Sequence, residues 1–162
     1  MNTILLSNLI KIRWIAITGQ FFAILIVYFL FKINILILES LVVVIFSVVV
    51  NLFTYFLQKQ DNKISDRLAF LFLLYDTGQL GILLYLTGGI FNPFCILVIA
   101  PVIISASYLP VFWTIILSFF SIILILFINL VYISIEWQGI FLTPNIYKQG
   151  LVSALIITIV FI

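Results

Sequence analysis

A chain of 162 residues in which 66% are hydrophobic and only 7% are charged is too apolar to fold as a soluble domain. Its mean hydropathy of +1.45 indicates that the lipid bilayer is its solvent. The net charge of +2 is too small to indicate nucleic-acid binding. Because histidine is absent and Cys95 is the only cysteine, we expect no metal site, no internal disulfide and no catalytic residue within the chain.

The apolar runs predict an all-α, polytopic membrane protein in which six spans form a helical bundle. A helix needs roughly 20 apolar residues to cross the hydrocarbon core. Runs of this kind, separated by charged or turn-forming residues, lie at residues 13–31, 39–57, 68–87, 94–109, 111–133 and 149–162. The fourth run is short and contains Pro101, which we expect to kink it. The last run stops at Ile162 without a polar flank, so we expect that span to be incomplete.

The distribution of Lys and Arg favours a cytoplasmic N-terminus. In this orientation the cytoplasmic basic residues are Lys11, Arg13, Lys59, Lys63 and Arg67, and the outer ones are Lys32 and Lys148. The connection between the third and fourth spans then faces outward. Any chain that follows Ile162 would emerge in the cytoplasm.

Asp76 is the only charged residue that this prediction places deep inside a span. A carboxylate at that depth costs about 3 kcal/mol, so something must offset the cost. Gln79 lies three residues later on the same helical face, and Gly78 and Gly81 would let another helix approach closely. Two interpretations stay open for Asp76. It is either a proton-linked or ligand-linked carboxyl group, or one side of a polar contact between helices.

Two further polar residues, Gln20 and Asn51, lie in the first and second predicted spans. Side-chain amides at such positions usually form hydrogen bonds between helices. We therefore expect both residues to hold helices together.

The segment 87–94, which we call the Gly-Gly turn, separates two apolar runs and is predicted to break the helix. Its candidate ligand-binding residues are Gly88, Gly89, Phe91, Asn92, Pro93 and Phe94. Adjacent glycines leave peptide N–H groups unshielded, and a residue before proline avoids the helical conformation. N–H donors, one side-chain amide and two aromatic rings suit a flat ring that bears carbonyl groups. The alternative is a structural loop that only joins two membrane helices.

Several short motifs in the chain resemble one family of membrane proteins. They are Arg13-Trp14, Gly19-Gln20, Asn51, Ser65-Asp66, Asp76, Gln79, the run 83–94 with its Gly-Gly-x-x-Asn-Pro-Phe core, Leu97, Ala100-Pro101-Val102, Ser105-Ala106 and Leu109-Pro110. These motifs are similar to the RegB/PrrB/ActS sensor histidine kinases of proteobacteria. The resemblance covers roughly residues 13–113, and its most specific part is the Gly-Gly turn.

The resemblance implies that residues 1–162 form the transmembrane sensor domain of a redox-responsive two-component kinase in the bacterial inner membrane. It implies ubiquinone as the sensed ligand, bound at the outer Gly-Gly turn. A homodimer, a cognate response regulator and a cytoplasmic kinase domain after Ile162 are also implied. That domain would carry the phosphoacceptor histidine, the ATP site and the redox cysteine, which Cys95 does not replace.

The main alternative is a small polytopic transporter or channel subunit. Asp76 would then be a proton or cation site, and the Gly-Gly turn would be a re-entrant gate. The absence of an inverted repeat and the single charge deep inside a predicted span disfavour it. A transporter predicts solute flux into liposomes, whereas a sensor predicts none.

Overall fold

The computed structural model describes residues 6–57, 64–137 and 140–141. Its five α-helices are α1 (Leu6–Leu25), α2 (Ile37–Leu57), α3 (Asp66–Leu86), α4 (Ile99–Tyr108) and α5 (Val111–Leu130). A π-helical turn, η1 (Ile26–Leu30), extends α1, and two 3-10 segments, η2 (Gly89–Phe91) and η3 (Pro93–Val98), join α3 to α4. The predicted all-α class is thus confirmed, apart from three very short strands.

Four helical segments of the described residues are long and apolar enough to cross a membrane. They are Ser7–Leu30, Ile37–Phe56, Asp66–Leu86 and Val111–Leu130. They overlap the predicted spans 13–31, 39–57, 68–87 and 111–133. The predicted span 94–109 corresponds to a shorter apolar helix, Phe94–Tyr108, and residues 149–162 lie outside the described part of the chain. The predicted count of six spans is therefore not confirmed.

One local feature differs from the sequence-based expectation. The first helix begins at Leu6, so Arg13 lies inside it and is buried instead of flanking it in the cytoplasm. Arg13 thus no longer counts among the flanking charges on which the predicted orientation depends. Pro101 is the third residue of α4, directly after the 3-10 segment η3, so the helix Phe94–Tyr108 changes from 3-10 to α geometry just before the proline. The kink expected at Pro101 stays a prediction.

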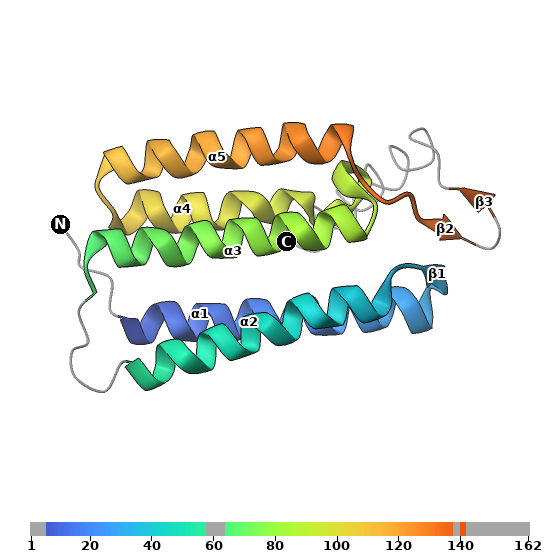
Figure 1. The fold of residues 1–162 in the computed structure, drawn as a ribbon, viewed down its shortest axis with the longest axis horizontal. Helices are drawn as coiled ribbons and strands as arrows, with labels where there is room; N and C mark the ends of the chain where they lie inside the picture. The colour runs from blue at the N-terminus through green and yellow to red at the C-terminus, as the bar shows by residue number, and fades with distance from the viewer. Residues whose placement is uncertain (1–5, 58–63, 138–139, 142–162) are drawn as a thin grey trace, which may run out of the picture.

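The helices run up and down in two groups, as Figure 1 shows. One group is the pair α1 and α2, and the other is α3, α4 and α5. Helix α3 is central, because it contacts α2, α4 and α5 and is buried over most of its circumference. The apolar faces of the other helices do not have to be buried against protein, since lipid tails are as apolar as leucine.

Close contact between α3 and α5 depends on one glycine. A Cβ atom on Gly81 would lie 2.7 Å from Cδ2 of Leu124 on α5, whereas nothing lies within 4 Å of a Cβ on Gly78. Of the two glycines expected to admit a neighbouring helix, only Gly81 does so.

A small antiparallel sheet lies at the end of the bundle where α1, α3 and α5 end (Figure 1). Its strands are β1 (Ile33–Asn34), β2 (Glu136–Trp137) and β3 (Ile140–Phe141), with β2 in the middle. In the register, Ile33 lies opposite Trp137, which lies opposite Ile140. The sheet joins the segments that follow α1 and α5, at the same end as the Gly-Gly turn.

Candidate functional site

A cavity of about 770 Å³ lies between α1 on one side and α3, η3 and α4 on the other. Most of its wall is aliphatic. Its polar wall residues are Arg13, Gln20, Ser47, Asp76, Gln79, Thr87 and Asn92. Small-molecule sites are typically apolar cavities of roughly 300–1,000 Å³ with a few fixed polar groups. By size and lining, this cavity is the candidate binding site.

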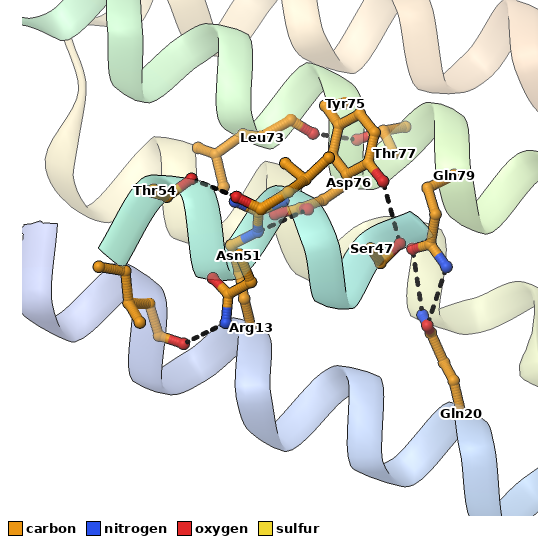
Figure 2. A network of polar contacts seen from close by, with 12 residues as sticks. Arg13, Gln20, Ser47, Asn51, Thr54, Leu73, Tyr75, Asp76, Thr77 and Gln79 are labelled. Atoms are coloured by element: carbon orange, nitrogen blue, oxygen red, sulfur yellow. Dashed lines mark hydrogen bonds and ion pairs between the residues drawn. The ribbon is translucent and has the colours of Figure 1, made fainter. Parts of the chain in front are cut away.

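An ion pair bridges α1 and α3 at the cavity wall (Figure 2). Arg13 Nε donates to Asp76 Oδ1 at 2.9 Å, and the two side chains are 4% and 24% exposed. The guanidinium carbon also lies 5.3 Å from the ring centroids of both Phe72 and Tyr75. Such cation–π contacts and the opposite charge offset part of the cost of keeping Arg13 out of water. Asp76 therefore makes a polar contact between helices, one of the two interpretations left open for it.

A second bridge between the same helices is formed by two amides. Gln79 Nε2 donates to Gln20 Oε1 at 2.9 Å, and Gln20 Nε2 donates back to Gln79 Oε1 at 3.4 Å. Figure 2 shows this pair next to the ion pair, as the spacing of Asp76 and Gln79 on α3 requires. We call Arg13, Gln20, Asp76 and Gln79 the polar belt of the cavity.

Helix α2 is tied to both neighbours by polar side chains near the belt. Asn51 Nδ2 donates to the carbonyl oxygen of Ile10 on α1 at 3.4 Å. The hydroxyls of Ser47 on α2 and Tyr75 on α3 lie 3.0 Å apart. The structure thus places both Gln20 and Asn51 in contacts between helices.

Some buried polar atoms have no hydrogen-bond partner within the described part of the chain. They are Arg13 Nη1 and Nη2, Ser40 Oγ and Asn51 Oδ1. A buried polar atom without a partner is uncommon, and each case calls for an explanation. The Arg13 atoms matter most, because they carry most of the donors of a charged group on the cavity wall.

The Gly-Gly turn ends α3 through two left-handed glycines. Gly88 and Gly89 have φ angles of 100° and 66°, which other residues rarely adopt. A Cβ on Gly89 would lie 2.7 Å from Cβ of Tyr132, so the turn also packs closely against the segment after α5. Both glycines are buried. This burial limits the access of a ligand to their N–H groups.

Asn92 holds the turn together with its own side chain. Its Nδ2 donates to Thr87 Oγ1 at 2.7 Å and to the Thr87 carbonyl oxygen at 3.1 Å. Its Oδ1 accepts from Phe94 N at 2.9 Å, which caps η3. Both hydrogen bonds that the Asn92 amide nitrogen donates are therefore made inside the turn, although Asn92 lines the cavity.

The structure brings only part of the predicted ligand set to the cavity. Asn92 and Phe94 line it, together with Asp76, Gln79 and Gln20. The side chains of two other predicted residues, Phe91 and Pro93, lie outside what the structure describes.

Three polar wall residues, Arg13, Ser47 and Thr87, have no site role predicted from the sequence. The signal for Arg13 is chemical, because ionisable residues within membrane helices usually pair with one another, and Asp76 lacks a partner in the sequence-based picture. The signal for Thr87 is its place directly before two glycines at a helix end. A hydroxyl there commonly bonds to the preceding turn of backbone, as Thr87 Oγ1 does to the Leu83 carbonyl oxygen at 2.6 Å.

Comparison with known proteins confirms the resemblance suggested by the motifs. The chain is 34% identical over 159 residues, 97% of its length, to "Sensor histidine kinase RegB" of Cereibacter sphaeroides. The chain spans 34% of the length of that relative. No family model matches the chain, and no solved structure matches it either.

Proposed function

We propose that this chain, which is similar to RegB over nearly its whole length, is the membrane sensor portion of a bacterial sensor histidine kinase. ATP-dependent autophosphorylation and phosphotransfer to a cognate response regulator are proposed for the complete protein. The chain itself contains no histidine to phosphorylate. An inner-membrane homodimer with cytoplasmic N-termini belongs to the same proposal.

We further propose that the sensed ligand is ubiquinone, bound in the cavity that the Gly-Gly turn and the polar belt share. The observation that carries this proposal is the combination of volume and lining in that cavity. A quinone has a flat ring with two carbonyl acceptors and a long apolar tail. The cavity has a volume of about 770 Å³ and a mostly aliphatic wall. Phe94 contributes an aromatic ring to this wall, and the polar belt contributes hydrogen-bond donors.

A sensor also needs a ligand-dependent change of state. A ligand shifts a conformational equilibrium only if it binds the two states with different affinity. Both bridges between α1 and α3 line the proposed site, so an occupant there acts directly on the contact between these two helices. Quinone offers only acceptors, whereas quinol also offers hydroxyl donors, so the two forms make different hydrogen bonds with the same belt.

Quinone titration of the purified chain in lipid nanodiscs tests this proposal. We expect saturable quenching of tryptophan fluorescence by a short-tailed ubiquinone analogue. The Asn92→Ala variant should bind more weakly, because the cavity end formed by the turn loses its internal hydrogen bonds. Asn129→Ala, an exposed asparagine on α5, is the matched control. Quenching that does not saturate, and that rises only in proportion to the analogue dissolved in the lipid, would contradict quinone sensing.

The transporter alternative predicts a different measurement. If Asp76 were a proton or cation site, proteoliposomes containing this chain would carry proton or cation flux. We expect none, because the Asp76 charge is already balanced by Arg13. Flux abolished by Asp76→Asn would favour the transporter.

A further inference from the structure

We infer that Gln20 is a ligand-binding residue whose amide nitrogen donates to a carbonyl oxygen of the cavity's occupant. Gln79 is its positioning residue, because it holds the Gln20 amide in place from α3. The inference rests on the proposed function for the identity of the ligand, a quinone. It adds the level of the cavity at which the head group is held and the side chain that holds it.

The Gln20 amide lies where an occupant can reach it. The cavity lies between α1 and α3, and Figure 2 shows the Gln20 side chain extended from α1 toward Gln79 on α3. Both residues line the cavity. Gln20 is half-buried, whereas Gln79 is only 7% exposed. Gln20 is thus the more accessible member of the pair.

The residues around Gln20 on α1 are small and leave its amide uncovered. Ala16 and Ala23, four residues before it and three residues after it, are its neighbours on the helix surface, and both line the cavity. Gly19 lines the cavity too, and nothing lies within 4 Å of a Cβ atom built on it. The wall next to the amide therefore has room for a flat ring.

The hydrogen bonds of the pair leave Gln20 with a donor to spare. Gln79 Nε2 donates to Gln20 Oε1 at 2.9 Å, which fixes the orientation of the Gln20 amide. Gln20 Nε2 donates back to Gln79 Oε1 at 3.4 Å, beyond the usual range of about 2.7–3.2 Å. An amide nitrogen carries two hydrogens, and Gln20 Nε2 donates no other bond within the described part of the chain. A carbonyl oxygen in the cavity can accept the second hydrogen without breaking either bond of the pair.

Two other polar residues of the wall are less suited to donate to an occupant. Arg13 is 3% exposed, and its guanidinium lies against the rings of Phe72 and Tyr75, which do not line the cavity. The Ser47 hydroxyl lies within hydrogen-bond distance of the Val43 carbonyl oxygen and the Tyr75 hydroxyl. Both residues therefore serve the contacts between helices.

The Gly-Gly turn lies at another level of the cavity. Thr87 follows Gln79 by eight residues, which is about 12 Å at 1.5 Å per residue. One six-membered ring does not span that distance. At the turn, Asn92 donates both of its side-chain hydrogen bonds to Thr87. A head group held by Gln20 therefore leaves the end of the cavity at the turn to the rest of the ligand.

The charges at the same level select a neutral head group. Asp76 lies three residues before Gln79, is 24% exposed and lines the cavity. Its charge is balanced by Arg13, so an anionic occupant would add an uncompensated negative charge to an apolar cavity, which is costly. A neutral carbonyl oxygen avoids that cost. Quinones and lipid esters both carry such an oxygen, and the experiment below separates the two.

The Gln20→Met variant tests the inference in lipid nanodiscs. Methionine has a similar length but no amide donor. We expect the affinity for a short-tailed ubiquinone analogue to fall about three- to tenfold, as for the loss of one neutral hydrogen bond. Thr18→Val removes a polar group from an exposed position of α1 that does not line the cavity, and this control should bind as the wild type does. The thermal midpoint of each variant checks that the bundle stays folded.

A spectroscopic signature separates ligand binding by Gln20 from a structural role. The analogue carries ¹³C at its ring carbonyls, so its infrared carbonyl band is distinct from that of lipid esters. A hydrogen bond weakens the C=O bond, so the band should lie at lower frequency in the wild type than in protein-free nanodiscs. It should return to the protein-free frequency in Gln20→Met. In Gln79→Met it should broaden but stay shifted, because Gln20 keeps its donor and loses its fixed orientation.

The possible outcomes separate this inference from the proposed function. Unchanged affinity in Gln20→Met, an unshifted band in the wild type or a shift that survives in Gln20→Met would overturn the inference. Quinone sensing would then stand, as when a lipid ester occupies Gln20. A wild-type chain that binds no analogue would overturn both. If Gln20→Met fails to accumulate, photolabelling of the wild type with an azido-quinone decides the matter. Label within residues 16–23 supports the inference, and its absence from these residues overturns it.

Discussion

At the residue scale, the pairing of Arg13 with Asp76 turns two unfavourable residues into one stable contact. Each alone would be a charge in an apolar environment, at a cost of several kcal/mol. Their exposures are unequal, with Arg13 at 4% and Asp76 at 24%. Loss of the carboxylate should therefore do more harm than loss of the guanidinium, because the charge left behind is more deeply buried.

We predict that Asp76→Asn lowers the free energy of unfolding by about 3–5 kcal/mol, since it leaves the Arg13 charge without a counter-charge. The double variant Arg13→Gln/Asp76→Asn should recover most of this loss, because no charge remains. Thermal unfolding in detergent micelles measures both effects. Asp66→Asn, in the first turn of α3, is the control and should change stability by less than about 1 kcal/mol. Equal losses in the single and double variants would show that the pair does not act as a unit.

At the scale of elements, α3 organises the molecule. It contacts α2, α4 and α5, carries Asp76 and Gln79 toward α1, and ends in the Gly-Gly turn at the cavity. Its approach to α5 depends on Gly81, where a side chain has no room, whereas Gly78 faces open space. The two glycines therefore form a natural test pair on one helix.

Gly81→Val should destabilise the packing of α3 on α5 by about 1–3 kcal/mol through overpacking against Leu124. Adding Leu124→Ala should restore stability by making room for the valine. Gly78→Val, with no neighbour within 4 Å of its Cβ, should be neutral or slightly stabilising. The thermal midpoints of the four proteins in micelles check this. A neutral Gly81→Val would mean that α5 moves away from α3 at no cost.

At the scale of the whole molecule, the cavity separates the two helix groups on the α1 side. Small residues on α1 help to keep it open, and Gly19 is one of them, because it lines the cavity with nothing within 4 Å of a Cβ. The two helix groups are joined instead by the contacts of α2 with α3 and by the pairing of β1 with β2. Cavity volume and bundle stability are therefore separable properties.

Gly19→Leu should fill part of the cavity and weaken binding of the ubiquinone analogue without lowering the thermal midpoint. The reason is that the added side chain enters open volume and also improves helix propensity. Gly78→Leu, equally uncrowded but not on the cavity wall, serves as the control. Fluorescence titration and thermal unfolding of the same nanodisc samples check both parts. If Gly19→Leu left the affinity for the ubiquinone analogue unchanged, the analogue would bind somewhere other than this cavity.

Local composition specifies which segments are helical and where α3 ends. Long apolar runs specify membrane helices, since an unpaired backbone in lipid leaves no alternative but a helix or a closed barrel. The end of α3 at Leu86 follows from Gly88 and Gly89, which adopt the left-handed conformation. The short motifs of the sequence also suffice to show the similarity to RegB.

Which polar groups meet depends on how the helices pack against one another. Arg13 and Asp76 are 63 residues apart in the chain, and Gln20 and Gln79 are 59 apart, so no local pattern pairs them. The same holds for the sheet, whose two-residue strands have too little pattern to be recognised. The cavity lies where α1 meets α3, and long polar side chains bridge the two helices along its wall. Hydropathy determines that a helix lies in the membrane, but the packing of one helix against another determines which side chains form the site.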